Sequence, residues 1–173
     1  EAATYNGHRI YGAMSYLVNH DCVFMLDEDN WYDPIHCETM LMNMQRDDAQ
    51  WCYSLRKVVD WEGNFLHNDD CDSLGVYPNY VRNMFVDMNC YVFRTEFLKD
   101  IAHSLYALEN ADNLLYKAAA YEAPVLGISS TGLYTVNYRL GRDVQHKWFK
   151  DGMQTIKSFY GNNKPWSAEW NNK

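Results

Sequence analysis

Apolar residues recur with a helical period at the start of the chain and then run together. Over residues 7–19 they lie three or four positions apart, as on one face of a helix. Residues 23–26 are continuously apolar, which is typical of a short strand covered on both faces of a sheet. The order of these segments predicts a helix that leads into a buried strand.

Two later segments have the two-residue period of strands. Residues 51–59 and 134–140 alternate apolar with more polar side chains. The first is followed by a Gly-containing turn and two further apolar residues, so residues 51–66 are predicted to form a β-hairpin.

A third alternating segment, residues 86–93, differs because its second face is polar. Asp87, Asn89 and Tyr91 are predicted to point one way, and the apolar residues between them the other way. A strand with this pattern presents a carboxylate and an amide side by side, either to a ligand or to water.

The remaining segments carry helix signals. Asp33 and Pro34 together predict a helix start, with Asp33 as the N-cap and Pro34 in the first turn. Thr95 is predicted to cap a helix with apolar residues over 97–108, and a second helix follows over about residues 112–121.

This order of elements predicts a single α/β domain over residues 1–173, with a mixed sheet flanked by helices. A last helix and a polar tail are expected over 141–173. Ligands of such sheets bind beyond the carboxyl ends of strands, and the acidic residues 27–29 fall at such an end.

Composition narrows the possible partners and compartments. The net charge of −8 and the pI near 5.1 argue against binding to nucleic acid, because few cations are available to neutralise phosphates. No apolar run approaches the roughly 20 residues that span a bilayer, and the first residues do not resemble a secretory signal. The 5 cysteines form no CxxC pair, so we expect them to be mostly reduced and buried in a cytoplasmic protein.

The acidic run Asp27-Glu28-Asp29 is the strongest chemical signal in the sequence. Two carboxylates one residue apart on a loop can face one divalent cation and leave most of its coordination sphere open. Mg²⁺ or Mn²⁺ bound in this way takes its other ligands from water and substrate phosphates. The alternative is an acidic loop that only faces water.

The run DEDNWYDP after a strand resembles the Asp-x-Asp motif of GT-A fold glycosyltransferases, especially the inverting family 2 type. The resemblance continues through the hairpin YSLRKVVDWEGNF, the acidic loop NDDCDSLG and the segment VDMNCYVFRTEFL. It ends in a helix opened by ENADNLL and covers about residues 6–140. It implies a GT-A-like core that transfers a sugar from a nucleotide-diphosphate donor to a hydroxyl acceptor.

The resemblance also assigns roles to the acidic residues. Asp29, the last acid of the motif, would ligate Mn²⁺ or Mg²⁺ and through it the diphosphate of a UDP- or GDP-linked sugar. Asp27 would contact the donor or reach the metal directly or through water, with Glu28 beside them at the cofactor.

In the same type of enzyme a carboxylate at a helix start deprotonates the acceptor hydroxyl. The matching region carries Glu109 and Asp112, and Asp112 is our first choice for this catalytic base. Asn110 interrupts the adjacent acidic pair that the family often has here. Asp112 could equally be only a helix N-cap.

Four further residues are candidates for substrate binding. Trp31 could stack on a sugar ring, while Asp87, Asn89 and Asp70 could bind acceptor hydroxyls. Each has an ordinary structural alternative: a core aromatic, a solvated strand face, or an acidic turn.

The resemblance does not extend to the first strands and helix of the family, which hold the nucleotide base. A sheet without these strands has an open edge, so we expect the truncated chain to form a homo-oligomer or to use a partner. Two alternatives follow: a carbohydrate- or nucleotide-binding remnant of the GT-A fold without turnover, and a phosphoryl hydrolase that uses residues 27, 29 and 69–72.

Overall fold

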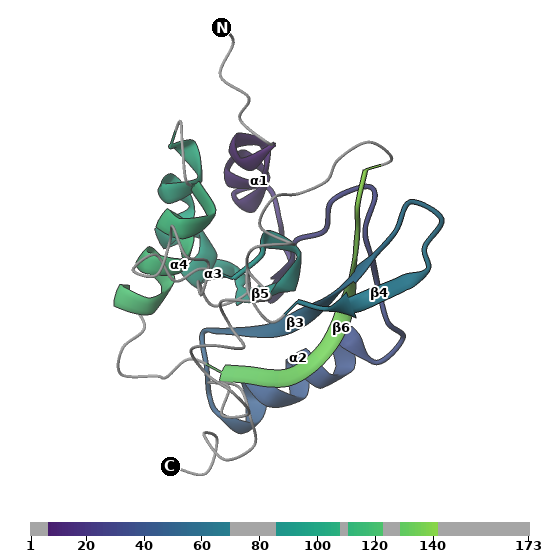
Figure 1. The fold of residues 1–173 in the computed structure, drawn as a ribbon. Helices are drawn as coiled ribbons and strands as arrows, with labels where there is room; N and C mark the ends of the chain where they lie inside the picture. Colours follow the sequence, from purple (N-terminus) through teal and green to yellow (C-terminus); the bar gives the residue numbers. More distant parts are fainter. Residues whose placement is uncertain (1–6, 70–85, 108–110, 123–128, 142–173) are drawn as a thin grey trace, which may run out of the picture.

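The computed structural model describes residues 7–69, 86–107, 111–122 and 129–141 (Figure 1). The helices, including two short 3₁₀ segments, are α1 (His8–Ser15), α2 (His36–Arg46), η1 (Met88–Cys90), α3 (Thr95–Ile101), η2 (Ala102–Tyr106) and α4 (Ala111–Glu122). The strands are β1 (Cys22–Phe24), β2 (Trp31–Tyr32), β3 (Trp51–Val59), β4 (Phe65–Asn68), β5 (Tyr91–Arg94) and β6 (Ser129–Arg139).

All of these strands belong to one mixed sheet. Its order is β1-β5-β3-β6-β2, and β4 pairs with β3 beside this path. Only the β3–β6 pair is parallel, and the remaining pairs are antiparallel. The predicted mixed α/β fold and the predicted β3–β4 hairpin are confirmed.

The pairing directions bring several strand ends to one edge of the sheet. Because β1 and β3 are both antiparallel to β5, they run parallel to each other, and β6 runs with them. The carboxyl ends of β1, β3 and β6 therefore lie at the same edge as the amino end of β5. Asp27 follows β1 and Asp87 precedes β5 at this edge.

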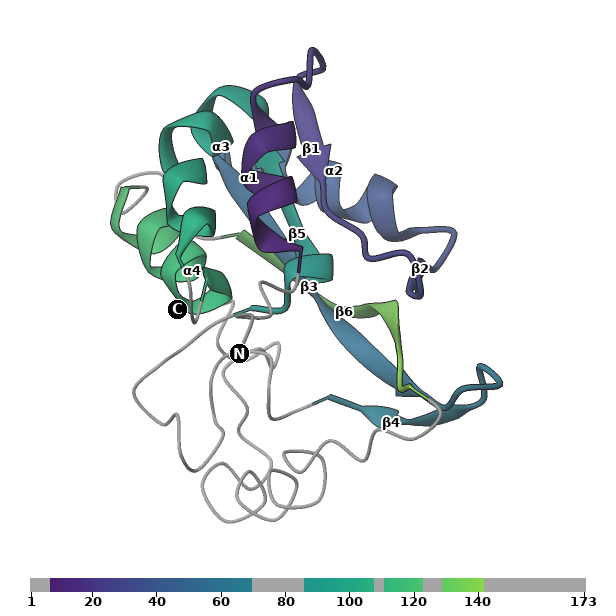
Figure 2. The ribbon, with the colours of Figure 1, turned by 90° about the horizontal axis from the view of Figure 1, so that it is seen from above.

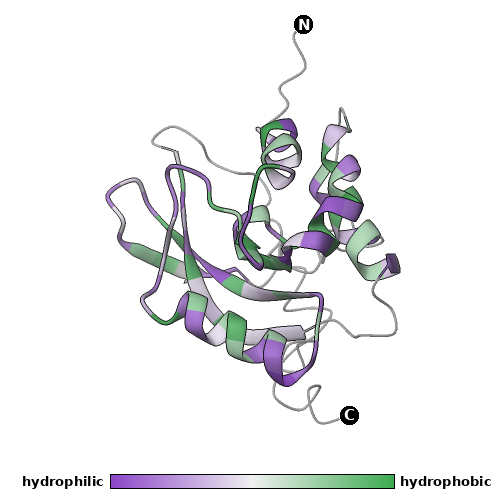
Figure 3. Ribbon diagram, turned by 180° about the vertical axis from the view of Figure 1, so that it is seen from behind, coloured by the Kyte–Doolittle hydropathy of each residue, from purple (hydrophilic) through white to green (hydrophobic). Residues whose placement is uncertain are grey.

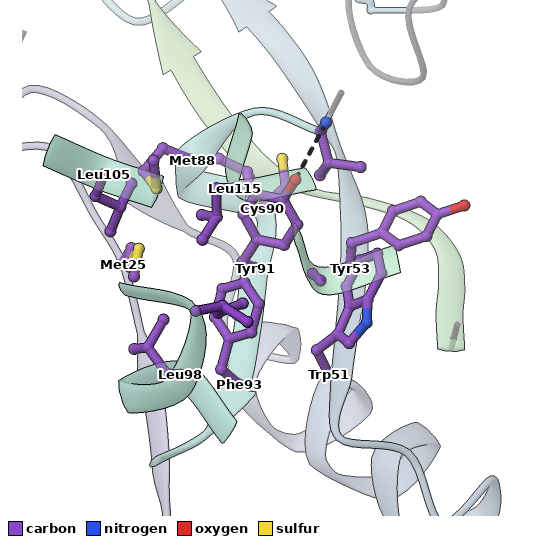
Figure 4. Close-up of a cluster of buried hydrophobic side chains, with 14 of the residues drawn as sticks. Met25, Trp51, Tyr53, Met88, Cys90, Tyr91, Phe93, Leu98, Leu105 and Leu115 are labelled. Atoms are coloured by element: carbon purple, nitrogen blue, oxygen red, sulfur yellow. Dashed lines mark hydrogen bonds between the residues drawn. The ribbon is translucent and has the colours of Figure 1, made fainter. Parts of the chain in front are cut away.

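Helices cover both faces of the sheet. Figure 2 shows α1, α3 and α4 over one face and α2 behind the other. The larger core lies under the first group of helices (Figure 4) and includes Met25, Trp51, Tyr53, Met88, Cys90, Tyr91, Phe93, Leu98, Leu105 and Leu115. Each of these side chains is almost completely removed from water, so this cluster supplies most of the apolar burial.

The second face is covered by α2, whose polar and apolar residues alternate along the helix (Figure 3). Met40 and Met44, one helical turn apart, pack on Cys52 and Val92 of the sheet. β3 is consequently buried on both faces, which corrects the one-sided alternation expected for residues 51–59.

Helix α1 comes close to η2 because position 12 lacks a side chain. A Cβ on Gly12 would lie 3.0 Å from the Tyr106 ring and 3.3 Å from the Ala102 carbonyl oxygen. This approach fixes α1 beside the carboxyl end of β1. Tyr11 of α1 points toward residues 27–30, which we call the acidic turn.

The strand predicted over 86–93 is wrong in its first half. Residues Met88–Cys90 form η1, and Asp87 caps it by accepting a 2.9 Å hydrogen bond from the Asn89 backbone N–H. Tyr91, expected on a polar face, is fully buried. This hydrogen bond between the Asn89 backbone and the Asp87 side chain competes with strand pairing, so β5 begins only at Tyr91.

Two predicted helix caps are also wrong. α2 begins at His36, because Asp33 instead accepts hydrogen bonds from Lys57 and Asn137. Thr95 is the first residue of α3, and its hydroxyl donates to the carbonyl oxygen of His20.

The other predicted elements are largely confirmed. α1 and α4 match the helices expected over 7–19 and 112–121, and β6 begins a few residues earlier than expected. The helix after Thr95 is confirmed up to residue 101, and the 3₁₀ segment η2 follows it directly. The helix and tail expected over 141–173 fall almost wholly outside the described residues.

Two of the cysteines fit the expected buried state. Cys52 and Cys90 are buried and free, whereas Cys22 is half-buried and Cys37 is exposed. Cys71 lies outside the described residues. None of the helices in the described part of the chain is long and apolar enough to cross a bilayer.

Candidate functional site

The carboxylate of Asp27 is held on both sides. Tyr11 donates a 2.6 Å hydrogen bond to Oδ1, and the Asn89 side-chain amide donates one of 2.9 Å to Oδ2. The Asp27 backbone N–H in turn donates to Asn89 Oδ1 over 2.6 Å. Three elements, α1, the turn after β1 and η1, therefore fix one carboxylate.

The two acids that follow Asp27 are free to meet a ligand. Residues 27–30 form a turn in which the Asn30 backbone N–H donates to the Asp27 carbonyl over 3.2 Å. The Asn30 side chain is buried and accepts from the Arg139 backbone N–H, so it anchors the turn to β6. Glu28 and Asp29 are exposed at its tip.

Asn89 joins the acidic turn to a second carboxylate. Its amide nitrogen also donates to Asp87 Oδ1 over 2.8 Å, and its side chain is 1% exposed. The structure thus brings Asp27, Asp87 and Asn89 together, although the predicted strand geometry for the last two is wrong.

Arg56 extends this network into the interior. Its guanidinium donates through Nε to Asp69 over 2.7 Å and forms a short ion pair through Nη1 with Asp87. The side chains of Arg56 and Asp69 are 1% and 0% exposed. The phosphoryl hydrolase alternative uses Asp69 as one of residues 69–72, but its carboxylate is buried against this arginine.

The pKa of the Tyr11 hydroxyl reflects its burial and the negative charges of the cluster. Burial raises its pKa well above the usual value, and the hydrogen bond to Asp27 raises it further. The negative charges of Asp27, Asp87 and Asp29 act in the same direction. Asp29 is therefore close enough to this cluster to act on it, although its side chain is exposed.

Asp112 lies in the first turn of α4 and is half-buried. Its Oδ1 accepts a 3.1 Å hydrogen bond from the Asn113 backbone N–H. Burial raises the pKa of Tyr91, and the charge of Asp112 contributes to that rise. The Tyr91 hydroxyl accepts from the Val86 backbone N–H at 3.3 Å (Figure 4), so Tyr91 lies beside the segment that leads into Asp87.

Other predicted residues lie apart from this cluster or outside the described residues. Trp31 is on β2, where the Arg139 guanidinium lies 5.0 Å from its ring. Glu109 and Asp70 fall outside the described residues. Their proposed roles stay predictions.

Sequence reasoning did not identify Tyr11 and did not anticipate the role of Arg56. Tyr11 is 16 residues before Asp27, and their contact depends on how α1 packs. The sequence patterns assigned no role to Arg56. No local signal marked its burial, because Arg56 and Lys57 are adjacent cations of β3 and only Arg56 is buried.

The cluster can supply only a small number of ligands to a metal. Among the residues that the structure describes, no group of three or more His, Cys, Asp or Glu side chains is arranged to hold an ion. A divalent ion here would depend on one or two carboxylates and on oxygens from its substrate, as the sequence motif implies.

Comparison with known proteins gives a structural likeness alone. No family model matches the sequence, and no curated protein matches it. A crystal structure of residues 1–349 of TarS from S. aureus, a glycosyltransferase, superposes with a TM-score of 0.55 at 11% identity. The match covers 92% of this chain and 53% of that one.

A second crystal structure of S. aureus TarS gives a similar result. Its TM-score is 0.54 at 14% identity, with 95% of this chain and 30% of that chain covered. The chain therefore spans about half the length of the first structure, or less of the second. A mixed sheet flanked by helices, matched in this way, is a partial glycosyltransferase-like fold.

Proposed function

We propose that this chain is the part of a GT-A type glycosyltransferase that holds the diphosphate and the acceptor. It would transfer a sugar from a UDP- or GDP-linked donor to a hydroxyl acceptor, with inversion as in family 2. The observation that carries the proposal is the Asp27–Asp29 turn. One carboxylate of this turn is fixed and the other is exposed at the carboxyl edge of a glycosyltransferase-like sheet.

The two acids suit different tasks. Asp29 has an exposed carboxylate and can bind Mn²⁺ or Mg²⁺ directly, with Glu28 beside it to attract the ion. Both oxygens of Asp27 already accept protein hydrogen bonds, which favours contact with the donor or with a metal-bound water. When bound, the ion would neutralise charge on the departing diphosphate.

Acceptor activation is assigned to Asp112. A sugar hydroxyl is a poor nucleophile until a carboxylate accepts its proton as the new bond forms. The position of Asp112 supports this role, because it lies in the first turn of α4 and its side chain is only half-buried. Glu109 stays the second candidate.

A second candidate function is a binding remnant of the same fold. The chain covers only 53% of the first matched structure, so a large part of that structure has no counterpart in the match. Such a remnant would bind a nucleotide or a carbohydrate without turnover.

Calorimetric titration with UDP and GDP, with and without Mn²⁺, is combined with an assay of donor hydrolysis. Together the two experiments distinguish an active glycosyltransferase from a binding remnant. The enzyme is expected to bind a nucleotide only with metal and to hydrolyse a UDP- or GDP-sugar slowly. Metal-dependent binding with no hydrolysis would indicate the remnant. Absence of binding to both nucleotides would contradict the proposal.

A further inference from the structure

We propose that Arg56 is a positioning residue that sets the orientation of Asp27 through Asp87 and Asn89, without touching Asp27 itself. The observation is a continuous series of hydrogen bonds from the interior of β3 to the acidic turn. The importance of this relay for catalysis rests on the proposed function, whereas its existence can be tested without it.

The relay begins with a buried cation between two carboxylates. Arg56 bonds Asp69, next to the end of β4, and Asp87, before η1. It also lies under Tyr138 of β6, with its guanidinium carbon 4.2 Å from the ring centre. These contacts leave the guanidinium little freedom to rotate, because its planar fork and its stacked face are both in use.

Arg56 supplies the opposite charge to a largely buried carboxylate. The Asp87 side chain is only 13% exposed, and a carboxylate so placed is costly without a cation nearby. The same carboxylate accepts from both the backbone N–H and the side-chain amide of Asn89.

Asn89 passes this orientation on to Asp27. Its amide nitrogen donates to Asp87 and to Asp27, and its oxygen accepts from the Asp27 backbone N–H. An amide flipped end for end would point its oxygen at two carboxylates. The position of the Asp87 carboxylate thus selects the amide orientation that holds the acidic turn.

Arg56 lies next to a local irregularity of the sheet. The pairing of β3 with β6 shifts register between Leu55 and Arg56. Beyond this shift Arg56 bonds Asp87, while the next residue, Lys57, bonds Asp33. Successive side chains of a strand point to opposite faces, so these two adjacent cations meet different carboxylates. Of the two, Arg56 is linked to the acidic turn, through Asp87 and Asn89.

The relay predicts thermodynamic coupling between two residues that do not touch. Arg56→Lys keeps the charge but cannot bond two carboxylates as a fork, and Asp27→Ala removes the end of the relay. In a double-mutant cycle on urea unfolding, the two changes are expected to deviate from additivity by at least about threefold in the unfolding equilibrium constant.

The matched control pairs Arg56→Lys with Asp47→Ala. Asp47 ends α2 and accepts from Ser129 at the start of β6, at the opposite edge of the sheet. This cycle is expected to be additive within about twofold. If Arg56→Lys does not fold, Tyr138→Leu, which removes the ring over the guanidinium, replaces it in both cycles.

Additivity of the Arg56 and Asp27 changes within about twofold would overturn the relay, whatever the protein binds. If the wild type binds a nucleotide with Mn²⁺, Arg56→Lys is expected to weaken that binding about tenfold and to add little in the Asp27→Ala background. Failure of nucleotide binding in the wild type would count against the proposed function and leave the stability cycle as the test of the relay.

Discussion

The hydroxyl of Tyr11 lies 2.6 Å from Oδ1 of Asp27 and donates a hydrogen bond to it. This contact joins the helix before β1 to the turn after it, so the two ends of one helix–strand unit close on each other. Since Asn89 holds the other carboxylate oxygen, Asp27 is oriented before any ligand arrives. The acidic turn is preorganised by the fold around it.

Tyr11→Phe is expected to lower the free energy of unfolding by about 1–3 kcal/mol, because a hydrogen bond to a charged group is lost and Asp27 Oδ1 loses a donor. Urea unfolding measures the change. Tyr121→Phe, on the exposed face of α4 with 80% exposure, is the control and should stay within about 0.5 kcal/mol of the wild type. Equal effects of the two changes would contradict the role of Tyr11.

Asn89→Asp is expected to be far more damaging than its small change in shape suggests. It places a third carboxylate between Asp27 and Asp87 and removes the donor that both share. We expect a loss of about 3–5 kcal/mol in the free energy of unfolding at pH 7, as for an uncompensated buried charge.

Part of this loss should return at pH 5, where one of the crowded carboxyls holds a proton. Asn43→Asp on α2, where the amide only donates to the Thr39 carbonyl, is the matched control. A pH-independent loss, or one no larger than that of the control, would count against the network.

The acidic edge of the fold was visible in the sequence because it follows a local rule. A short apolar run followed by carboxylates predicts a strand with acids after it, and β1 and the turn after Phe24 confirm this order. The expected burial of this strand on both faces is wrong, because β1 is half-buried and lies at the end of the strand order. The β3–β4 hairpin was likewise readable from the Gly63 turn.

The network behind that edge was not readable, because its bonds join residues far apart in the chain. Asn89 meets Asp27 across 62 positions, and Arg56 meets Asp87 across 31. The alternating sequence pattern also predicted that Asp87 and Asn89 lie on a strand. Instead, the Asp87 side chain caps the 3₁₀ helix η1 where the strand was expected to start. Tertiary contacts thus overrode the local pattern where the site is built.

His36 gives the fold a pH dependence unrelated to the acidic turn. It is fully buried, stacks on Tyr32 with ring centres 3.8 Å apart, and its Nδ1 lies 2.7 Å from the Thr135 hydroxyl. Burial lowers its pKa from 6.5 to about 4, and the charge of Asp33 opposes this shift only in part. The folded state therefore holds His36 neutral.

Below pH 6.5 the unfolded chain binds a proton at His36 that the folded chain does not. Stability is therefore expected to fall between pH 6.5 and about 4, by an amount on the order of 1–3 kcal/mol, and to be fully present above this range. Urea unfolding across the range measures it. His36→Phe keeps a ring on Tyr32 and should remove most of this slope, while an unchanged slope would show that other groups cause it.

The account depends most on the claim that the acidic turn binds a divalent ion and, through it, a diphosphate. Calorimetric titration of UDP and GDP in Mn²⁺ into Asp29→Ala tests it, with Asp100→Ala, at an exposed position of α3, as the control. Asp100→Ala is predicted to keep the metal-dependent binding of the wild type, and Asp29→Ala to lose it. Binding by Asp29→Ala that still requires the metal and matches the control in affinity would contradict the claim.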